Sequence, residues 1–189
     1  MDPFLRATDV IDWTHPAVLE AARALRGDAA DDAHVAARCY AWVRDEIRHS
    51  ADFGLRTVTC RASDVLRHGT GYCYAKSHLL AALLRANGIP AGLAYQRLAL
   101  DEAGVRFCLH GLNAVWLPES GWYRIDARGN KPGIDAGFEP PRERLAFTPR
   151  LPGERDVDGV LPDPLPIVVA ALGAYEDAAE LGDHLPDLP

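Results

Sequence analysis

Apolar residues recur at helical spacing in the first half of the chain. Between residues 16 and 26 they fall three or four positions apart, and Gly27 follows, which predicts a helix that ends at this glycine. A second helix is predicted to start at Asp31 or Asp32, because its apolar residues again form one stripe: Val35, Cys39, Trp42, Val43 and Ile47. The same stripe makes Cys39 a predicted core residue.

Residues 72–87 give the strongest helical pattern in the sequence. Apolar side chains cover most of the helix surface, and the segment ends at Asn87-Gly88 with Pro90 beyond. We therefore expect a central, buried helix here. Just before it, the pattern from Ser63 onward predicts a short capped turn that ends at Gly69.

After Pro90 the pattern changes to that of strands. Strands are predicted at residues 91–100, 105–117 and 122–126, with turns at 101–104 and 118–121. Consecutive strands joined by short turns form antiparallel hairpins. Helices that precede an antiparallel sheet predict an α+β fold.

The last part of the chain is less regular. Residues 149–166 are rich in proline and acidic residues, which predicts an extended segment over the surface, and residues 167–181 predict a final helix. A chain of 189 residues is in the range of one hydrophobic core. We therefore expect a single domain over residues 1–189.

Charge and cysteine content narrow the classes of function. The chain has 20 basic and 27 acidic residues, a net charge of −7, and no basic run that could follow a phosphate backbone, so nucleic acid is not an expected partner. The N-terminal residues lack the pattern of a signal peptide, and no membrane span is evident, which predicts a cytoplasmic protein without a membrane partner. The four cysteines are too scattered for a disulfide framework and form no Cys-x-x-Cys pair.

One of these cysteines, Cys73, stands where a glycine-containing loop enters the strongest predicted helix. A helix N-terminus offers free backbone N–H groups and a positive dipole potential, both of which favour thiolate over thiol. Cys73 is therefore a candidate nucleophile. A small buried residue in the first helical turn is the alternative interpretation.

His110 and Asp126 are the partners that such a nucleophile needs. His110 is predicted to share a face of its strand with Cys108, and Asp126 ends the next strand, so that one hairpin would place the acid beside the histidine. A carboxylate there can orient the imidazole toward a thiol. Taken singly, His110 also fits a structural histidine, Asp126 a turn residue and Cys108 a packing residue.

Three ordered motifs resemble the transglutaminase-like superfamily, which is related to the papain-like proteases. Residues 71–91, which begin Gly71-Tyr72-Cys73, resemble its cysteine helix; residues 110–116 are similar to its histidine strand and residues 122–126 to its aspartate strand. The resemblance covers about residues 35–130, the expected core, and leaves residues 149–189 as a C-terminal extension. The chain departs from the commoner His-Ala-Trp pattern with Gly111 and Leu112, a change that bears on substrate class.

The resemblance implies a papain-like α+β core and a Cys73-His110-Asp126 triad. It also implies a hydrolase or acyltransferase that forms a thioester with a peptide or protein substrate, with water or an amine as acceptor and no cofactor. We expect the Cys73 backbone N–H to hold part of the oxyanion, and Gln96 or the preceding loop are candidates for the second donor. Gln96 also fits a solvent-facing strand residue.

Two other interpretations stay open. The first is a catalytically silent interaction module that keeps the fold. The second is metal binding by Cys73, Cys108 and His110, although these residues lack compact ligand spacing and a clear fourth ligand. The sequence does not indicate an oligomeric state.

Overall fold

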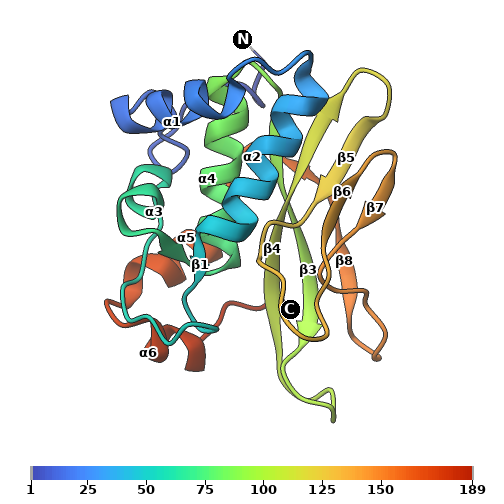
Figure 1. Cartoon of the computed structure of the whole chain (residues 1–189). Helices are drawn as coiled ribbons and strands as arrows, with labels where there is room; N and C mark the ends of the chain where they lie inside the picture. The colour runs from blue at the N-terminus through green and yellow to red at the C-terminus, as the bar shows by residue number, and fades with distance from the viewer. Residues whose placement is uncertain (1, 189) are drawn as a thin grey trace.

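The computed structural model describes residues 2–188, in which helices and a sheet form two layers (Figure 1). The helical layer contains α1 (Pro16–Arg26), α2 (Asp32–Glu46), α3 (Ala62–His68) and α4 (Cys73–Ala86). The sheet has the strand order β5 (Gly121–Ile125), β4 (Phe107–Leu117), β3 (Ala91–Ala99) and β8 (Arg155–Leu161), and every neighbouring pair is antiparallel. This architecture confirms the predicted α+β fold.

Helix α4 is the centre of the molecule. Thirteen of its 14 residues are buried, and helices α1 to α3 and strands β3 and β4 all contact it. Even its polar side chains are enclosed: Arg85 is 2% exposed, and its Nε donates to the Ala91 carbonyl at 2.9 Å. The wide apolar surface predicted for this segment is therefore the core of the protein.

Local capping explains where the shorter elements begin and end. The Asp31 side chain accepts a hydrogen bond from the His34 N–H at 2.9 Å and so starts α2. Gly69 follows α3 at φ 63°, a left-handed conformation that favours glycine. Ser63 does not cap α3 as the pattern suggested, because the helix begins earlier, at Ala62, and the Ser63 hydroxyl donates to Asp12 Oδ2 at 2.6 Å.

Strand β4 is longer than its neighbour β5, which leaves part of its edge open. Strand β5 pairs only with residues 113–117 of β4. Residues 107–111 pair with β3 on the other side, and within the described part of the chain no strand lies beside their outer edge in the sheet. This open edge of β4 faces the N-terminal end of α4, as the contacts of Gly111 show below.

Two predictions for residues 149–189 are wrong. Strand β8 lies within the segment that was predicted to run extended over the surface, and it pairs with β3 as an edge strand. The predicted helix over 167–181 is two helices, α5 (Pro166–Ala174) and α6 (Ala178–Asp183), because Tyr175 is extended and Asp177 caps a new start. The proline and acidic content concealed β8, since edge strands tolerate such residues.

Four very short strands were not predicted. Strand β1 (Arg48–His49) pairs in parallel with β2 (Thr70–Gly71), and β6 (Gly137–Glu139) pairs with β7 (Arg142–Arg144) in a hairpin. Two or three residues are too few to show an alternating pattern. The β1–β2 pair matters for the site, because it sets His49 opposite Gly71, two residues before Cys73.

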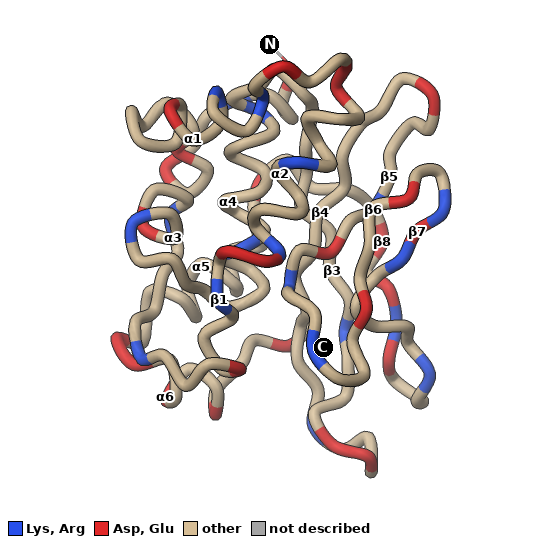
Figure 2. Tube along the Cα trace, in the orientation of Figure 1, with Lys and Arg blue, Asp and Glu red and all other residues tan. Residues whose placement is uncertain are grey.

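Acidic and basic residues are interspersed over the chain rather than separated into regions of one sign (Figure 2). Within residues 2–188, no helix is long and apolar enough to cross a membrane. The cytoplasmic location and the single domain stay predictions.

Candidate active site

Cys73 is the first residue of α4, and its position depends on a tight entry loop. A Cβ at Gly71 would lie 2.9 Å from both Ala75 Cβ and Thr59 Oγ1, so only glycine lets the chain turn into the helix this closely. Because Cys73 is in the first helical turn, its backbone N–H has no intrahelical acceptor. The thiol therefore sits beside free backbone donors.

The start of α4 approaches the open edge of β4 without an intervening side chain. The Gly111 N–H donates to the Cys73 sulfur at 3.4 Å, and the Tyr74 hydroxyl donates to the Leu109 carbonyl. A Cβ at Gly111 would lie 2.9 Å from Tyr74 Cδ1 and 3.1 Å from Tyr74 Cα. Glycine after the histidine, the departure noted in the sequence, is thus what allows helix and strand to touch.

His110 and Asp126 form a buried pair beside this contact. The His110 Nε2 atom lies 2.7 Å from Asp126 Oδ2, and Asp126 follows the last residue of β5. Its carboxylate also accepts the N–H groups of Arg128 and Ala146, each at 3.1 Å. These bonds fix the carboxylate, which in turn orients the imidazole.

The charges of this pair support one another. Burial disfavours imidazolium, but the Asp126 carboxylate and the Cys73 sulfur outweigh it and raise the pKa of His110 to about 10. Burial likewise works against the Asp126 carboxylate, yet His110 and the two backbone donors keep the pKa of Asp126 below its usual value. The pair therefore favours imidazolium with carboxylate.

Cys73 and His110 open onto one cavity of about 610 Å³. Its walls combine apolar and polar side chains, among them Tyr72, Leu98, Cys108, Phe147, Arg128, Glu154 and Leu185. The Phe147 ring meets the His110 ring edge to face, with 5.0 Å between centroids. A substrate group bound in this cavity would touch both residues.

Two polar residues that line this cavity were not singled out from the sequence, His49 and Arg128. His49 lines the cavity and is 7% exposed, and burial together with the Arg128 charge lowers the pKa of His49 to about 3, so its ring is neutral at pH 7. Arg128 also lines the cavity, and its Nη2 donates to Asp52 Oδ1 at 3.0 Å. Only the pairing of β1 with β2 brings His49 here, and no local motif marks that pairing.

Lys76 connects α4 to the segment that carries His49. Its Nζ donates to the Arg44 carbonyl at 3.2 Å and to the Ile47 carbonyl, which lie at the C-terminal end of α2. Burial, followed by the Arg128 charge, lowers the pKa of Lys76 to about 7. This lysine, three residues after Cys73, holds the two helices in register.

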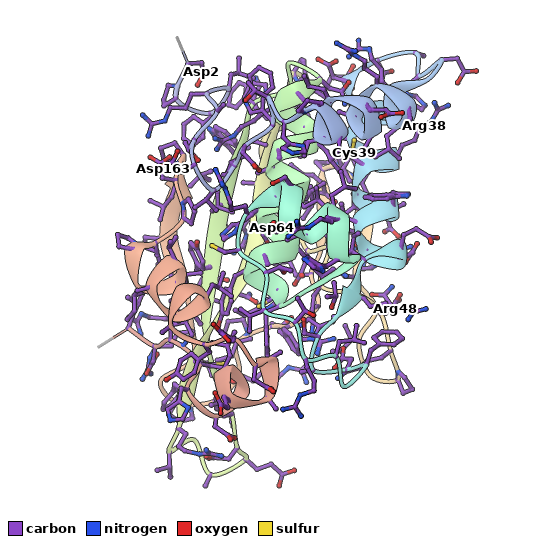
Figure 3. All side chains as sticks on the ribbon, turned by 90° about the vertical axis from the view of Figure 1, so that its left-hand side faces the viewer. Asp2, Arg38, Cys39, Arg48, Asp64 and Asp163 are labelled. Atoms are coloured by element: carbon purple, nitrogen blue, oxygen red, sulfur yellow. The ribbon has the colours of Figure 1, made fainter. Side chains whose placement is uncertain are left out.

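Gln96 and Cys39 do not line the cavity that Cys73 and His110 share. Gln96 Nε2 donates to Asp156 Oδ1 at 2.9 Å, so this amide is engaged with β8, and at 1% exposure the side chain is not solvent-facing. Cys39 lies inside the helical layer (Figure 3), is fully buried, and burial raises its pKa to about 12.

Cys108 shares the face of β4 with His110, as predicted, and lines the cavity. Burial raises its pKa to about 12 and keeps the thiol protonated at neutral pH. Across residues 2–188, no three His, Cys, Asp or Glu side chains gather closely enough to hold a metal ion. No ligand cluster among these residues therefore supports the interpretation that Cys73, Cys108 and His110 bind a metal ion.

The family of this protein follows from its sequence and fold together. The model of the transglutaminase-like superfamily matches residues 20–127, more than half of the chain, and the chain belongs to this superfamily. The match spans α2 to β5 and so includes Cys73, His110 and Asp126. No curated protein matches the chain significantly.

Two solved structures resemble this chain at low sequence identity. A candidate cysteine protease from Cytophaga hutchinsonii superposes with a TM-score of 0.54 and 21% identity, covering 67% of this chain and 41% of that one. The periplasmic domain of TgpA from Pseudomonas aeruginosa gives a TM-score of 0.49 and 26% identity, with coverage of 67% and 48%. The chain thus spans less than half the length of either.

Proposed function

We propose that this protein is a cysteine-dependent enzyme that hydrolyses or transfers amide or peptide bonds through a thioester. Cys73 is the nucleophile, His110 the general base and acid, and Asp126 the residue that orients His110. The observation that carries the proposal is the meeting of Cys73 and His110 in one cavity, with Asp126 held 2.7 Å behind the imidazole. Nucleophile, base and orienting acid in this order are the requirements of covalent acyl transfer.

The reaction proceeds in two steps. The Cys73 sulfur attacks the carbonyl carbon after its proton has passed to His110, and the carbonyl electron pair moves to the oxygen. When this intermediate collapses, the carbon–nitrogen bond breaks and His110 returns the proton to the leaving amine. Water or a second amine then attacks the thioester, with His110 as base, and releases Cys73.

The negative oxygen of the intermediate requires hydrogen-bond donors. The Cys73 N–H is free of helical partners at the start of α4 and is our first donor. Gly111 offers a second N–H at the same place, but in this structure it faces the Cys73 sulfur at 3.4 Å. The substrate we propose is a peptide or protein, and no cofactor is required by the chemistry.

The test compares wild type with Cys73→Ala on peptide-amide and glutamine-donor substrates, with and without an added amine. We expect the wild type to release amine or form a new amide and Cys73→Ala to do neither. Cys39→Ala is the matched control, because it removes a thiol from the helical layer instead of the cavity. Release of ammonia without incorporation of amine would assign hydrolysis.

Thiol labelling distinguishes an enzyme from a silent module of the same fold. At neutral pH iodoacetamide should modify Cys73 faster than the other three cysteines, because burial raises the pKa of Cys39, Cys60 and Cys108. Mass spectrometry of the peptide that contains Cys73 separates it from the other three cysteines. An unreactive Cys73 in a protein without turnover would favour the silent interaction module.

A further inference from the structure

Residues 184–188, which we call the covering segment, run beside the open edge of β4. The Leu109 N–H donates to the Pro186 carbonyl at 2.7 Å, which is the bond that an added strand makes with a sheet edge. Gly111, two residues along the same edge, turns its N–H to the Cys73 sulfur. Two residues of a strand span about 7 Å, so the covering segment binds next to the nucleophile.

The residues before the covering segment hold it over the cavity. The Tyr72 hydroxyl donates to the Ala178 carbonyl of α6 at 2.7 Å, and a Cβ at Gly182 would lie 2.9 Å from that hydroxyl. The chain therefore passes from Tyr72 on one side of Cys73 to Leu109 on the other. Between these contacts, Leu185 lines the same cavity as Cys73.

A guanidinium group anchors the other end of the covering segment. Arg97 binds Asp187 with two parallel hydrogen bonds, Nε to Oδ1 and Nη2 to Oδ2, each 2.7 Å long. The guanidinium carbon lies 3.8 Å from the centroid of the Phe107 ring, and Nη1 donates to the Gly153 carbonyl at 3.0 Å. Neither contact involves the covering segment, so Arg97 is oriented for a carboxylate whether or not Asp187 is present.

We propose that the edge of β4 between Arg97 and Cys73 is a peptide-binding groove for substrates in extended conformation, and that the covering segment occupies it as such a substrate would. The preferred peptide has an apolar side chain in the cavity, where Leu185 lies, and a carboxylate two residues later on Arg97. Its backbone carbonyl between them accepts the Leu109 N–H. Substrate and covering segment compete, so the covering segment lowers apparent affinity until it is displaced.

This inference rests on the proposed function in treating the bound peptide as a substrate. Its test does not require turnover. Asp187→Asn keeps the full chain and the shape of the side chain but removes the charge that Arg97 binds. We expect iodoacetamide to modify Cys73 about fivefold faster in Asp187→Asn than in wild type, the effect of losing a partly exposed ion pair. Glu180→Gln, an exposed carboxylate on α6, is the matched control and should leave the rate unchanged.

A peptide probe tests the specificity directly. Acetyl-Leu-Pro-Asp-Leu-amide at millimolar concentration should slow the labelling of Cys73 in Asp187→Asn, whereas the same peptide with Asn in place of Asp should not. Arg97→Gln should abolish this protection while circular dichroism confirms the fold. Equal labelling rates in wild type and Asp187→Asn, or equal protection of Cys73 by both peptides, would overturn the proposal of a peptide-binding groove.

The two proposals fail in different ways. If the acidic peptide protects Cys73 but no peptide amide is ever cleaved, the groove stands and the enzymatic proposal fails. If Cys73-dependent turnover is found but neither peptide protects and Asp187→Asn labels like wild type, the enzyme stands and the groove is wrong.

Discussion

The Nε2 atom of His110 is 2.7 Å from Asp126 Oδ2, so Nδ1 is the ring nitrogen that remains available to exchange a proton with the Cys73 thiol. Asp126→Asn preserves size but removes the charge that raises the pKa of His110. We predict a fall in acyl-transfer rate on the order of 10²-fold or more, because imidazolium is no longer stabilised. Steady-state kinetics with a peptide amide measures it. An unchanged rate would mean that Asp126 is only a turn residue and that the site contains at most a Cys-His dyad.

Cys73→Ala and Cys39→Ala should separate chemistry from packing. Cys73→Ala is predicted to abolish activity with little change in the free energy of unfolding, since the cavity already borders this side chain. Cys39→Ala should lower the free energy of unfolding by roughly 1–2 kcal/mol through a core void, with activity per folded molecule preserved. Urea denaturation and a turnover assay on both proteins provide the comparison. A folded but inactive Cys39→Ala would show that the nucleophile is wrongly chosen.

Gly111→Ala should push α4 away from β4. The added methyl would lie 2.9 to 3.2 Å from atoms of Tyr74, including its backbone, so we predict a loss of about 1–3 kcal/mol in stability together with a slower Cys73 alkylation. Thermal unfolding and labelling rates measure the two effects. Gly173→Ala, which meets no atom within 4 Å on α5, is the control and should be neutral or stabilising. Wild-type behaviour of Gly111→Ala would mean that the close approach is not required.

Buried neutral histidines make the protein sensitive to acid. His78 is fully buried, its Nδ1–H donates to the Cys60 carbonyl at 2.8 Å, and burial lowers its pKa to about 4. The unfolded chain takes up this proton near pH 6.5, so stability is complete above pH 6.5 and is lost as the pH falls toward about 4. One such group accounts for up to about 1.4 kcal/mol per pH unit in that window.

His78→Gln should therefore flatten the acid limb of the stability curve. Urea midpoints between pH 7 and pH 4 should fall less steeply in the variant, although its stability at pH 7 will itself be lower. His49, which is also buried and neutral, should keep part of the slope. The same slope in both proteins would show that His78 does not carry the acid sensitivity.

The sequence was sufficient for the elements that have a strong period. Helix α4 and strands β3, β4 and β5 were predicted within two residues of their ends, because wide apolar surfaces and short turns mark them. Strand β8 was not, since four of its seven residues are exposed and Gly159 interrupts it at φ 88°. A strand that only completes a sheet edge has little apolar pattern to reveal it.

The same contrast holds within the candidate site. Cys73, His110 and Asp126 could be proposed because each stands in a motif and the three motifs follow one another at fixed intervals. His49, Arg97 and Arg128 could not, since pairings between distant segments bring them to the cavity or the edge of β4. The burial of Gln96 was missed for the same reason, because its partner Asp156 is on the unpredicted β8.

The open edge of β4 also bears on how these molecules behave in concentrated solution. An unpaired strand edge is a template on which neighbouring molecules can build intermolecular sheet. Three of the backbone groups on this edge are already engaged: the Leu109 carbonyl by the Tyr74 hydroxyl, the Leu109 N–H by Pro186, and the Gly111 N–H by the Cys73 sulfur. Because proline has no N–H, Pro186 accepts one hydrogen bond from Leu109 and donates none in return, so the covering segment occupies this edge without continuing the sheet as a regular strand would.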